Sequence, residues 1–289
     1  MSRGWRLACE SWNVIQADRS LLAFPLMSAA ATLLAGAAIF GPGAYYSVHD
    51  DSRVPLIVAG AIAAYPLTFI STFFSVAFLV VARKRLTGEA ATIRTGLDAA
   101  RERLGAIAAW ALVATVFGVV LQVLQRLPFV DHLGRIAGIV VALILDIAWS
   151  LTTFFVIPAM AVDGVGPREA MRRSLQTFRK RWGESVTGGV VIGASFGVLV
   201  FPIAFVAIIG VEVFRSSPGP GAVILAIAVG LFQIWSAAET AVTRLFSLAL
   251  YEYANDREVT GPYSTADLEA AFKPRESRVG RLRRRFGRG

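Results

Sequence analysis

The stretch VALILDIAWSLTTFFV, from Val141 to Val156, decides the class of fold to which this chain belongs. Its apolar residues form an almost continuous run without strand-like alternation, which predicts a helix that is apolar all round, as in a membrane span. Asp146 interrupts the run, and the segment contains no basic residue that could neutralise its carboxylate. Charged residues within membrane spans are rare and usually have a role, so Asp146 is a candidate site residue.

The composition of the whole chain is that of a membrane protein. Of its 289 residues, 55% are hydrophobic and 17% are charged, whereas soluble domains carry about 25% charged residues. A helix needs about 20 apolar residues to cross the roughly 30 Å hydrocarbon layer. Six windows are long enough, namely 21–40, 55–82, 105–124, 136–162, 186–213 and 222–250. The sequence therefore predicts an all-α, polytopic membrane helical bundle with six transmembrane helices.

Basic residues are concentrated on one side of the predicted spans. Most of the 29 Lys and Arg residues lie in the N-terminal segment, in the loops at 83–104 and 163–185, and in the tail after Leu250. Because short basic loops are retained in the cytoplasm, both termini are predicted to be cytoplasmic and the protein to lie in the cell membrane. The net charge of +9 then faces anionic lipid headgroups. This placement explains the charge without nucleic acid, which is not expected as a partner.

The two long inner loops share one amphipathic pattern. Each carries four apolar residues spaced as one stripe of a helix: Ile93, Leu97, Ala100 and Leu104 in the first, and Met171, Leu175, Phe178 and Trp182 in the second. Pro167 suits the first turn of the second helix, and the N-terminal segment matches the pattern loosely through Trp12 and Ile15. We therefore predict three repeats, each a short interfacial helix followed by a hairpin of two spans.

Polar residues occupy matching positions in the spans that close the second and third repeats. Aligning these spans places Asp146 opposite Glu239 and Ser150 opposite Thr243. In each span the hydroxyl lies one helical turn from the carboxyl, where it can donate a hydrogen bond. Arg244 is the only cation within a predicted span. The candidate intramembrane polar site therefore comprises Asp146, Ser150, Glu239, Thr243 and Arg244.

Two interpretations of these polar residues compete. The favoured one is that they join helices through buried hydrogen bonds. The alternative is a transport or proton site, which intramembrane acids often build. The sequence indicates no third acid, no basic partner at matched depth and no broken helix of the kind that forms transporter sites, and these absences weigh against transport.

The chain divides into a transmembrane domain at 1–256 and a basic cytoplasmic tail at 257–289 with one short predicted helix. The tail ends in RVGRLRRRFGRG, which is too charged to fold alone and suits an anionic lipid surface. The predicted lipid-surface contacts are basic residues of the second inner loop and of this tail: Arg172, Arg173, Arg179, Lys180, Arg181, Arg283, Arg284 and Arg285.

Several stretches resemble an uncharacterised family of six-span bacterial and archaeal membrane proteins, known only as a domain of unknown function. They are GWRLACESWNVIQADRSLLAFPLMS, WSLTTFFVIPAMAVDGVGPREAMRRSLQTFRKRWGE and ALYEYANDREVTGPYSTADLEAAFKP, at residues 4–28, 149–184 and 249–274. The resemblance covers most of the chain and implies its architecture, but it carries no catalytic or ligand-binding residue. Glu239 and Arg244 depart from the more apolar pattern of the family.

Two functional hypotheses follow from these patterns. No nucleophile elbow, phosphate loop or metal-ligand spacing occurs, so an enzyme, a metal site and a cofactor are not expected. The first hypothesis is a non-enzymatic membrane protein with a scaffold, assembly or lipid-interacting role and a possible membrane-protein partner. The second is a carrier for a small solute, ion or lipid that uses Asp146 and Glu239 as protonatable or cation-binding groups.

Overall fold

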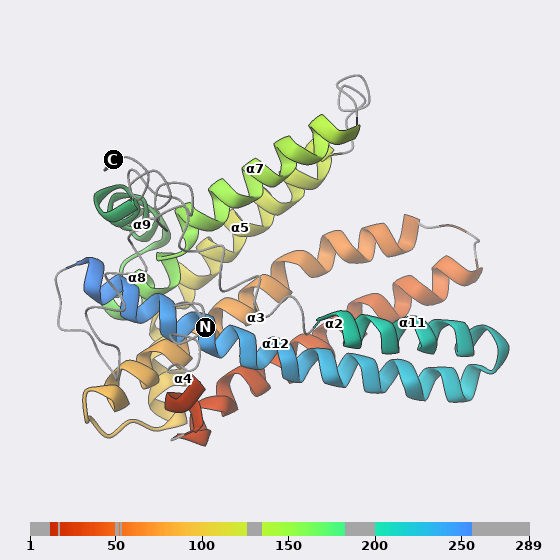
Figure 1. The fold of residues 1–289 in the computed structure, drawn as a ribbon, viewed down its shortest axis with the longest axis horizontal. Helices are drawn as coiled ribbons and strands as arrows, with labels where there is room; N and C mark the ends of the chain where they lie inside the picture. The colour runs from red at the N-terminus through yellow and green to blue at the C-terminus, as the bar shows by residue number, and fades with distance from the viewer. Residues whose placement is uncertain are drawn as a thin grey trace, which may run out of the picture.

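The computed structural model describes residues 12–16, 18–49, 52, 54–125, 135–182 and 200–255 (Figure 1). These residues form helices and turns, and no strand occurs among them, which confirms the predicted all-α class. Five stretches are long and apolar enough to cross a membrane: Ser20–Ser47, Val54–Leu86, Leu104–Val123, Leu143–Asp163 and Gly219–Ala254. The predicted span at 186–213 is described only from residue 200, where α11 (Val200–Ser216) begins, so the count of six remains a prediction.

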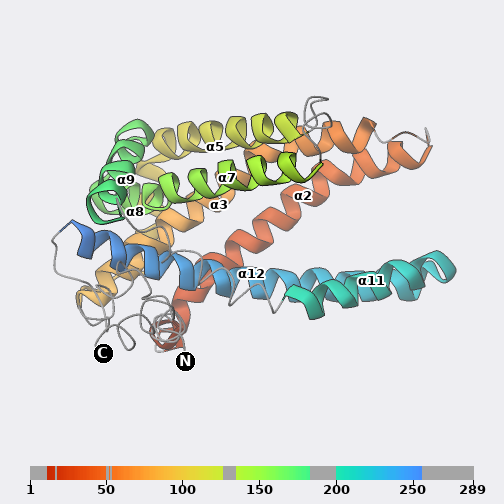
Figure 2. The ribbon, with the colours of Figure 1, turned by 45° about the horizontal axis from the view of Figure 1, so that its top comes forward.

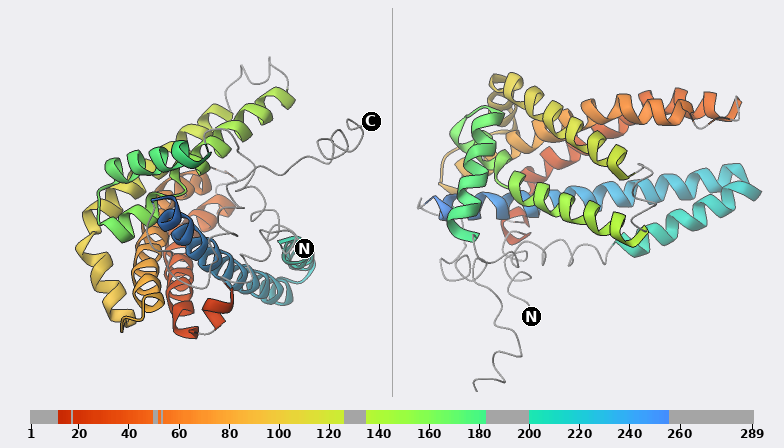
Figure 3. Two further views of the ribbon diagram at one scale, coloured as in Figure 1. Left: turned by 60° about the vertical axis from the view of Figure 1, so that its left-hand side comes forward. Right: turned by 90° about the horizontal axis from the view of Figure 1, so that it is seen from above.

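The long helices contact one another as chain neighbours. A 3₁₀ turn, η1 (Arg19–Leu22), leads into α2 (Ala23–His49), which packs along α3 (Val54–Leu86), and α11 packs along α12 (Pro218–Ala254). Between these pairs, α5 (Leu104–Gln125) contacts α7 (Arg135–Thr153). Figure 2 shows the α11–α12 pair running apart from the α5–α7 pair, and Figure 3 shows it diverging from α2 and α3. The three-repeat relationship remains a prediction.

The hydrophobic core lies at one end of the molecule, where the helix pairs meet. It is built mainly from the C-terminal parts of α3 and α12 and from α8 (Val156–Asp163), and Leu79, Met160 and Leu245 are buried in it. The opposite halves of the long helices expose large apolar side chains, including Ile57, Ile62, Ile144, Phe205 and Ile234. This distribution is expected of a membrane protein, because lipid tails solvate exposed apolar side chains as well as a core does.

The predicted span at 136–162 is broken in the middle. Helix α7 ends at Thr153 and α8 begins at Val156, with a turn at Phe154 and Phe155. Pro158 explains the break, because it has no N–H to donate to the carbonyl group four residues earlier and its ring clashes there. The buried Ser174 repairs the exposed backbone: its hydroxyl donates to the Thr152 carbonyl at 2.5 Å and accepts from the Phe155 N–H at 3.2 Å. The sequence analysis expected no broken helix, and the turn between α7 and α8 shows that this expectation was wrong.

Both amphipathic loop helices are observed, and their apolar faces contact protein. Thr92 begins α4 (Ile93–Glu102) with a capping box to Thr95, and Pro167 begins α9 (Pro167–Trp182). Helix α4 packs on α3, and α9 packs on α8. The predicted stripes supply these contacts through Ile93, Leu97, Ala100, Met171 and Phe178, whereas Leu104 is 42% exposed. Their apolar faces therefore cover the core, and a position in the membrane interface remains a prediction.

Candidate functional site

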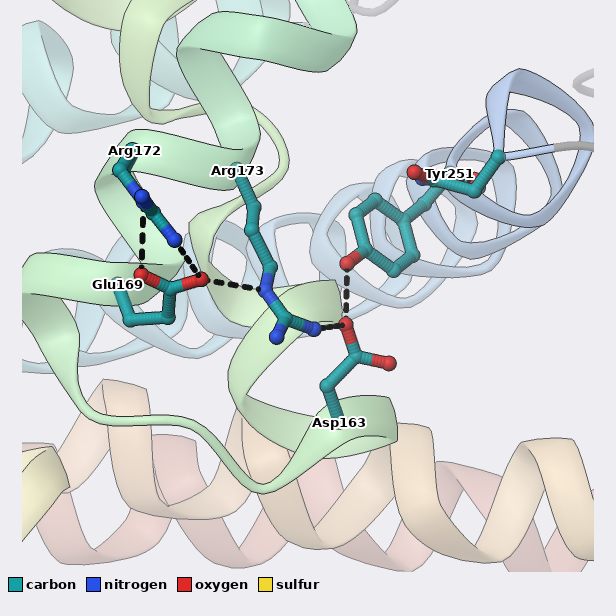
Figure 4. A network of polar contacts seen from close by, with 6 residues as sticks. Asp163, Glu169, Arg172, Arg173 and Tyr251 are labelled. Carbon is teal, nitrogen blue, oxygen red and sulfur yellow. Dashed lines mark hydrogen bonds and ion pairs between the residues drawn. The ribbon is translucent and has the colours of Figure 1, made fainter.

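A charged network joins three helices at the core end of the molecule (Figure 4). Asp163, the last residue of α8, lies 2.5 Å from Nη1 of Arg173 on α9, and the hydroxyl of Tyr251 on α12 donates to the same carboxylate at 2.6 Å. The Asp163 side chain is only 7% exposed. Gly164, with φ of +64°, ends α8 in the left-handed region and so turns the chain directly into α9. The network therefore fixes the angles between α8, α9 and α12.

Glu169 extends this network along α9. Its carboxylate accepts hydrogen bonds from Arg172 and from Arg173, each at 2.9 Å. Hydrogen bonds from Arg172, and then those from Arg173, favour the ionised carboxylate and lower the pKa of Glu169 to about 2. The hydrogen bond to Glu169, and then the one to Asp163, raise the pKa of Arg173. Arg173 thus bridges two carboxylates and stays charged.

The lowered pKa gives a prediction for acid stability. A carboxylate whose pKa is lower in the folded state stabilises that state fully above its ordinary pKa of about 4.5, and the contribution is lost as the pH falls toward about 2. We therefore expect Glu169→Gln to be less stable than wild type at pH 6 and to lose less stability between pH 5 and pH 2.5. Thermal unfolding of the detergent-solubilised chain measures this. Glu102→Gln, at an exposed acid of α4, is the control. If the melting temperatures of wild type and of Glu169→Gln fall equally between pH 5 and pH 2.5, the low pKa of Glu169 is contradicted.

Two further ion pairs hold the C-terminal end of α3. Nε of Arg83 lies 2.9 Å from the buried Glu252 carboxylate of α12. Arg85 binds Asp18 and Ser20 beside η1. Burial raises the pKa of Asp18, but hydrogen bonds from Ser20 and Arg85 outweigh that effect, and the pKa lies below its ordinary value. These pairs tie the N-terminal segment and the last helix to α3.

The sequence did not identify Arg83, Tyr251 or Glu252 as members of a network. The sequence pattern that could identify these three residues was weak, because each lies near a helix end among other basic or aromatic residues. Only the packing of α3, α8, α9 and α12 brings their side chains together. A carboxylate just after the last predicted span, as Glu252 is, could have suggested a basic partner on another helix.

The five predicted intramembrane residues lie in different environments. Asp146 and Ser150 are exposed on α7. On α12, Thr243 donates to Glu239 at 3.0 Å, as the one-turn spacing predicts, and both residues are half-buried. Arg244 is half-buried and lines two cavities, and neither Asp146 nor Glu239 lines either of them.

The predicted lipid contacts are described only in part. Arg172 and Arg179 are exposed on α9, whereas Arg173 turns inward to Asp163. The side chains of Lys180 and Arg181, and the whole of Arg283, Arg284 and Arg285, lie outside the described residues. Within the described ranges, no three His, Cys, Asp or Glu side chains gather closely enough to hold a metal ion.

Comparison with known proteins gives one match. The model of a family of unknown function, DUF6159, matches residues 57–261, which include every described helix from α4 to α12 and most of α3. No curated protein matches the chain, and no solved structure matches it.

Proposed function

We propose a function from the premise that this chain belongs to DUF6159, a family of unknown function. The chain acts as a non-enzymatic, multi-pass protein of the cell membrane that binds anionic lipid through one basic face, in a scaffold or assembly role. The basic face comprises the exposed arginines of α4 and α9: Arg94, Arg101, Arg168, Arg172 and Arg179. Both termini lie on the cytoplasmic side with it.

The position of the basic face carries this proposal. Helices α4 and α9 lie at the core end, opposite the α2–α3 turn and the α11–α12 turn (Figure 1). Arg94 is 90% exposed. The two acids of α4, Asp98 and Glu102, balance its two arginines, so the net positive charge of the basic face comes from α9. Each basic residue near an anionic membrane surface contributes about 1 kcal/mol of attraction. Several arginines at one end of a bundle of apolar helices therefore suit anionic headgroups.

The non-enzymatic part of the proposal rests on the sequence and on the use of the buried charges. Asp163 and Glu252 each form an ion pair with an arginine. The arginines that bind Glu169 hold its carboxylate ionised, which makes it a poor general acid or base. The alternative carrier with Asp146 and Glu239 gains no support from the cavities, since neither acid lines them.

Lipid selectivity tests the basic face. We expect the double variant Arg168→Gln, Arg179→Gln, reconstituted in mixed phosphatidylglycerol and phosphatidylcholine, to lose several-fold of the wild-type preference for phosphatidylglycerol at low salt. Spin-labelled lipids measure the preference at the protein surface. Arg215→Gln is the control, because Arg215 is exposed at the far end of α11 beside Glu212. An unchanged preference in the double variant contradicts the proposal.

A further inference from the structure

We propose that the space around Arg244 is a binding site for an oxyanion, the phosphate or carboxylate of a membrane amphiphile or of a soluble anion. The site goes beyond the basic face, because it lies between the spans and uses other residues. One cavity of about 160 Å³ lies between α2, α3 and α12. A second, of about 400 Å³, is lined from α3, α5, α7, α8 and α12. Both are lined by Leu67, Ser71 and Arg244, so Arg244 reaches both spaces.

The charge in these cavities is positive. Among the residues that the structure describes, Arg244 is the only charged one that lines either cavity. Within the described ranges Arg244 forms no ion pair and no side-chain hydrogen bond. Glu239 attracts it electrostatically without contact, and the Glu239 carboxylate accepts from Thr243. A lone arginine within a span is costly, and such residues face a bundle interior or a cavity and mark a substrate pathway or a charged partner. The missing partner here is an anion.

The cavity lining provides further hydrogen-bond donors. Hydroxyl residues from three helices line the smaller cavity together with Arg244: Ser28, Thr32, Ser71, Ser236 and Thr240. A guanidinium presents five N–H donors in a planar fork that matches carboxylate and phosphate oxygens, and a hydroxyl adds a neutral donor. The hydroxyls of Thr68 and Thr72 are used within α3, since they donate to the Ala64 and Thr68 carbonyls. The remaining donors suit one tetrahedral or planar oxyanion.

The break between α7 and α8 lies against the larger cavity. Thr153 and Ile157, on either side of the turn, line it together with Arg244. Non-helical backbone at membrane depth is tolerated only where it is buried in protein or lines a cavity, and broken helices are typical of ligand sites between spans. The break therefore supports a ligand site here. The apolar residues Pro25, Phe74 and Phe78 line the smaller cavity and suit the hydrocarbon part of an amphiphile.

Native mass spectrometry of the full chain, titrated with phosphatidylglycerol or with phosphatidylcholine, tests this site. We expect one saturable phosphatidylglycerol molecule on wild type and weaker binding of phosphatidylcholine. Because a hydrogen bond to a charged group contributes about 1.5–3 kcal/mol, Arg244→Gln should weaken phosphatidylglycerol about 10-fold to 100-fold. Thr240→Val, which removes one hydroxyl at nearly constant volume, should weaken it several-fold.

Control variants separate this site from the basic face. The double variant Arg168→Gln, Arg179→Gln should keep the saturable molecule, and so should Arg215→Gln. If inorganic phosphate displaces phosphatidylglycerol, the site also takes soluble oxyanions; if phosphate does not compete, it selects the lipid. Equal affinity of Arg244→Gln and wild type, equal binding of both lipids, or no saturable binding of either probe overturns the proposal. Should Arg244→Gln fail to fold, Thr240→Val and Ser71→Ala decide the question.

Discussion

Gly96→Ala is expected to lower the free energy of unfolding by about 2–3 kcal/mol. A Cβ at position 96 would lie 2.7 Å from the backbone carbonyl oxygen of Ala77 and 2.7 Å from Cγ2 of Val81, with the Phe24 ring at 2.9 Å. All three belong to the buried core, so α4 must move away from α3. The glycine is therefore required for the close approach of the two helices.

Gly105→Ala is the matched control for Gly96→Ala. No atom lies within 4 Å of a Cβ built at Gly105, which is exposed in the first turn of α5. Alanine has the higher helix propensity, so this variant should be neutral or up to about 1 kcal/mol more stable than wild type. Equilibrium unfolding of both variants in the same detergent measures the difference. Equal stability of the two variants contradicts the close packing of α4 on α3.

Arg173→Met should destabilise the fold by about 2 kcal/mol. The substitution takes a cation from the Asp163 carboxylate, which is nearly buried, and removing one partner of a buried pair costs about 3–5 kcal/mol. The Arg173 side chain is 37% exposed, so water offsets part of this loss. Methionine keeps the apolar stem of the side chain, which leaves the loss of charge as the main change.

Arg172→Met is the matched control, because it removes an arginine at the neighbouring position. Arg172 is 65% exposed and binds Glu169, not Asp163. We expect the midpoint of thermal unfolding of Arg172→Met to fall less than that of Arg173→Met, because an exposed ion pair such as Arg172–Glu169 contributes little to stability. A double-mutant cycle of Arg173→Met with Tyr251→Phe should show coupling, since both donate to Asp163. Additive effects in that cycle, or equal losses at positions 172 and 173, would show that Asp163 does not join α9 to α12.

The sequence predicted those features that depend on local patterns. Continuous apolar runs predicted membrane helices, and the described part of the chain has five that are long enough to span. The stripe from Ile93 predicted α4, and Pro167 stands at the start of α9. The spacing of Thr243 from Glu239 predicted their hydrogen bond. Each of these features is set within one helix by its period of 3.6 residues.

The features that the sequence missed depend on contacts between helices. Pro158 stands in the sequence, but the break that it causes is completed by Ser174, nineteen residues after Phe155. Asp146 and Glu239 suggested a common site by their matching positions, yet the cavities are lined by Arg244 and hydroxyl residues. Which face of a membrane helix packs on protein depends on the neighbouring helices. Lipid is as apolar as the protein interior, so the hydrophobicity of a residue does not show whether it faces lipid or protein.

The sequence by itself determined that this chain is a helical membrane protein, where most of its helices lie and which of its segments are basic. Hydrophobicity and charge act on each segment separately, so they can be deduced without a fold. Only the tertiary structure decided that the apolar faces of α4 and α9 pack on protein and that Arg173 turns inward to Asp163. It also decided that the described lining of the cavities at Arg244 contains no carboxylate. These outcomes depend on which helices meet, because a buried charge takes its partner from whatever element packs beside it.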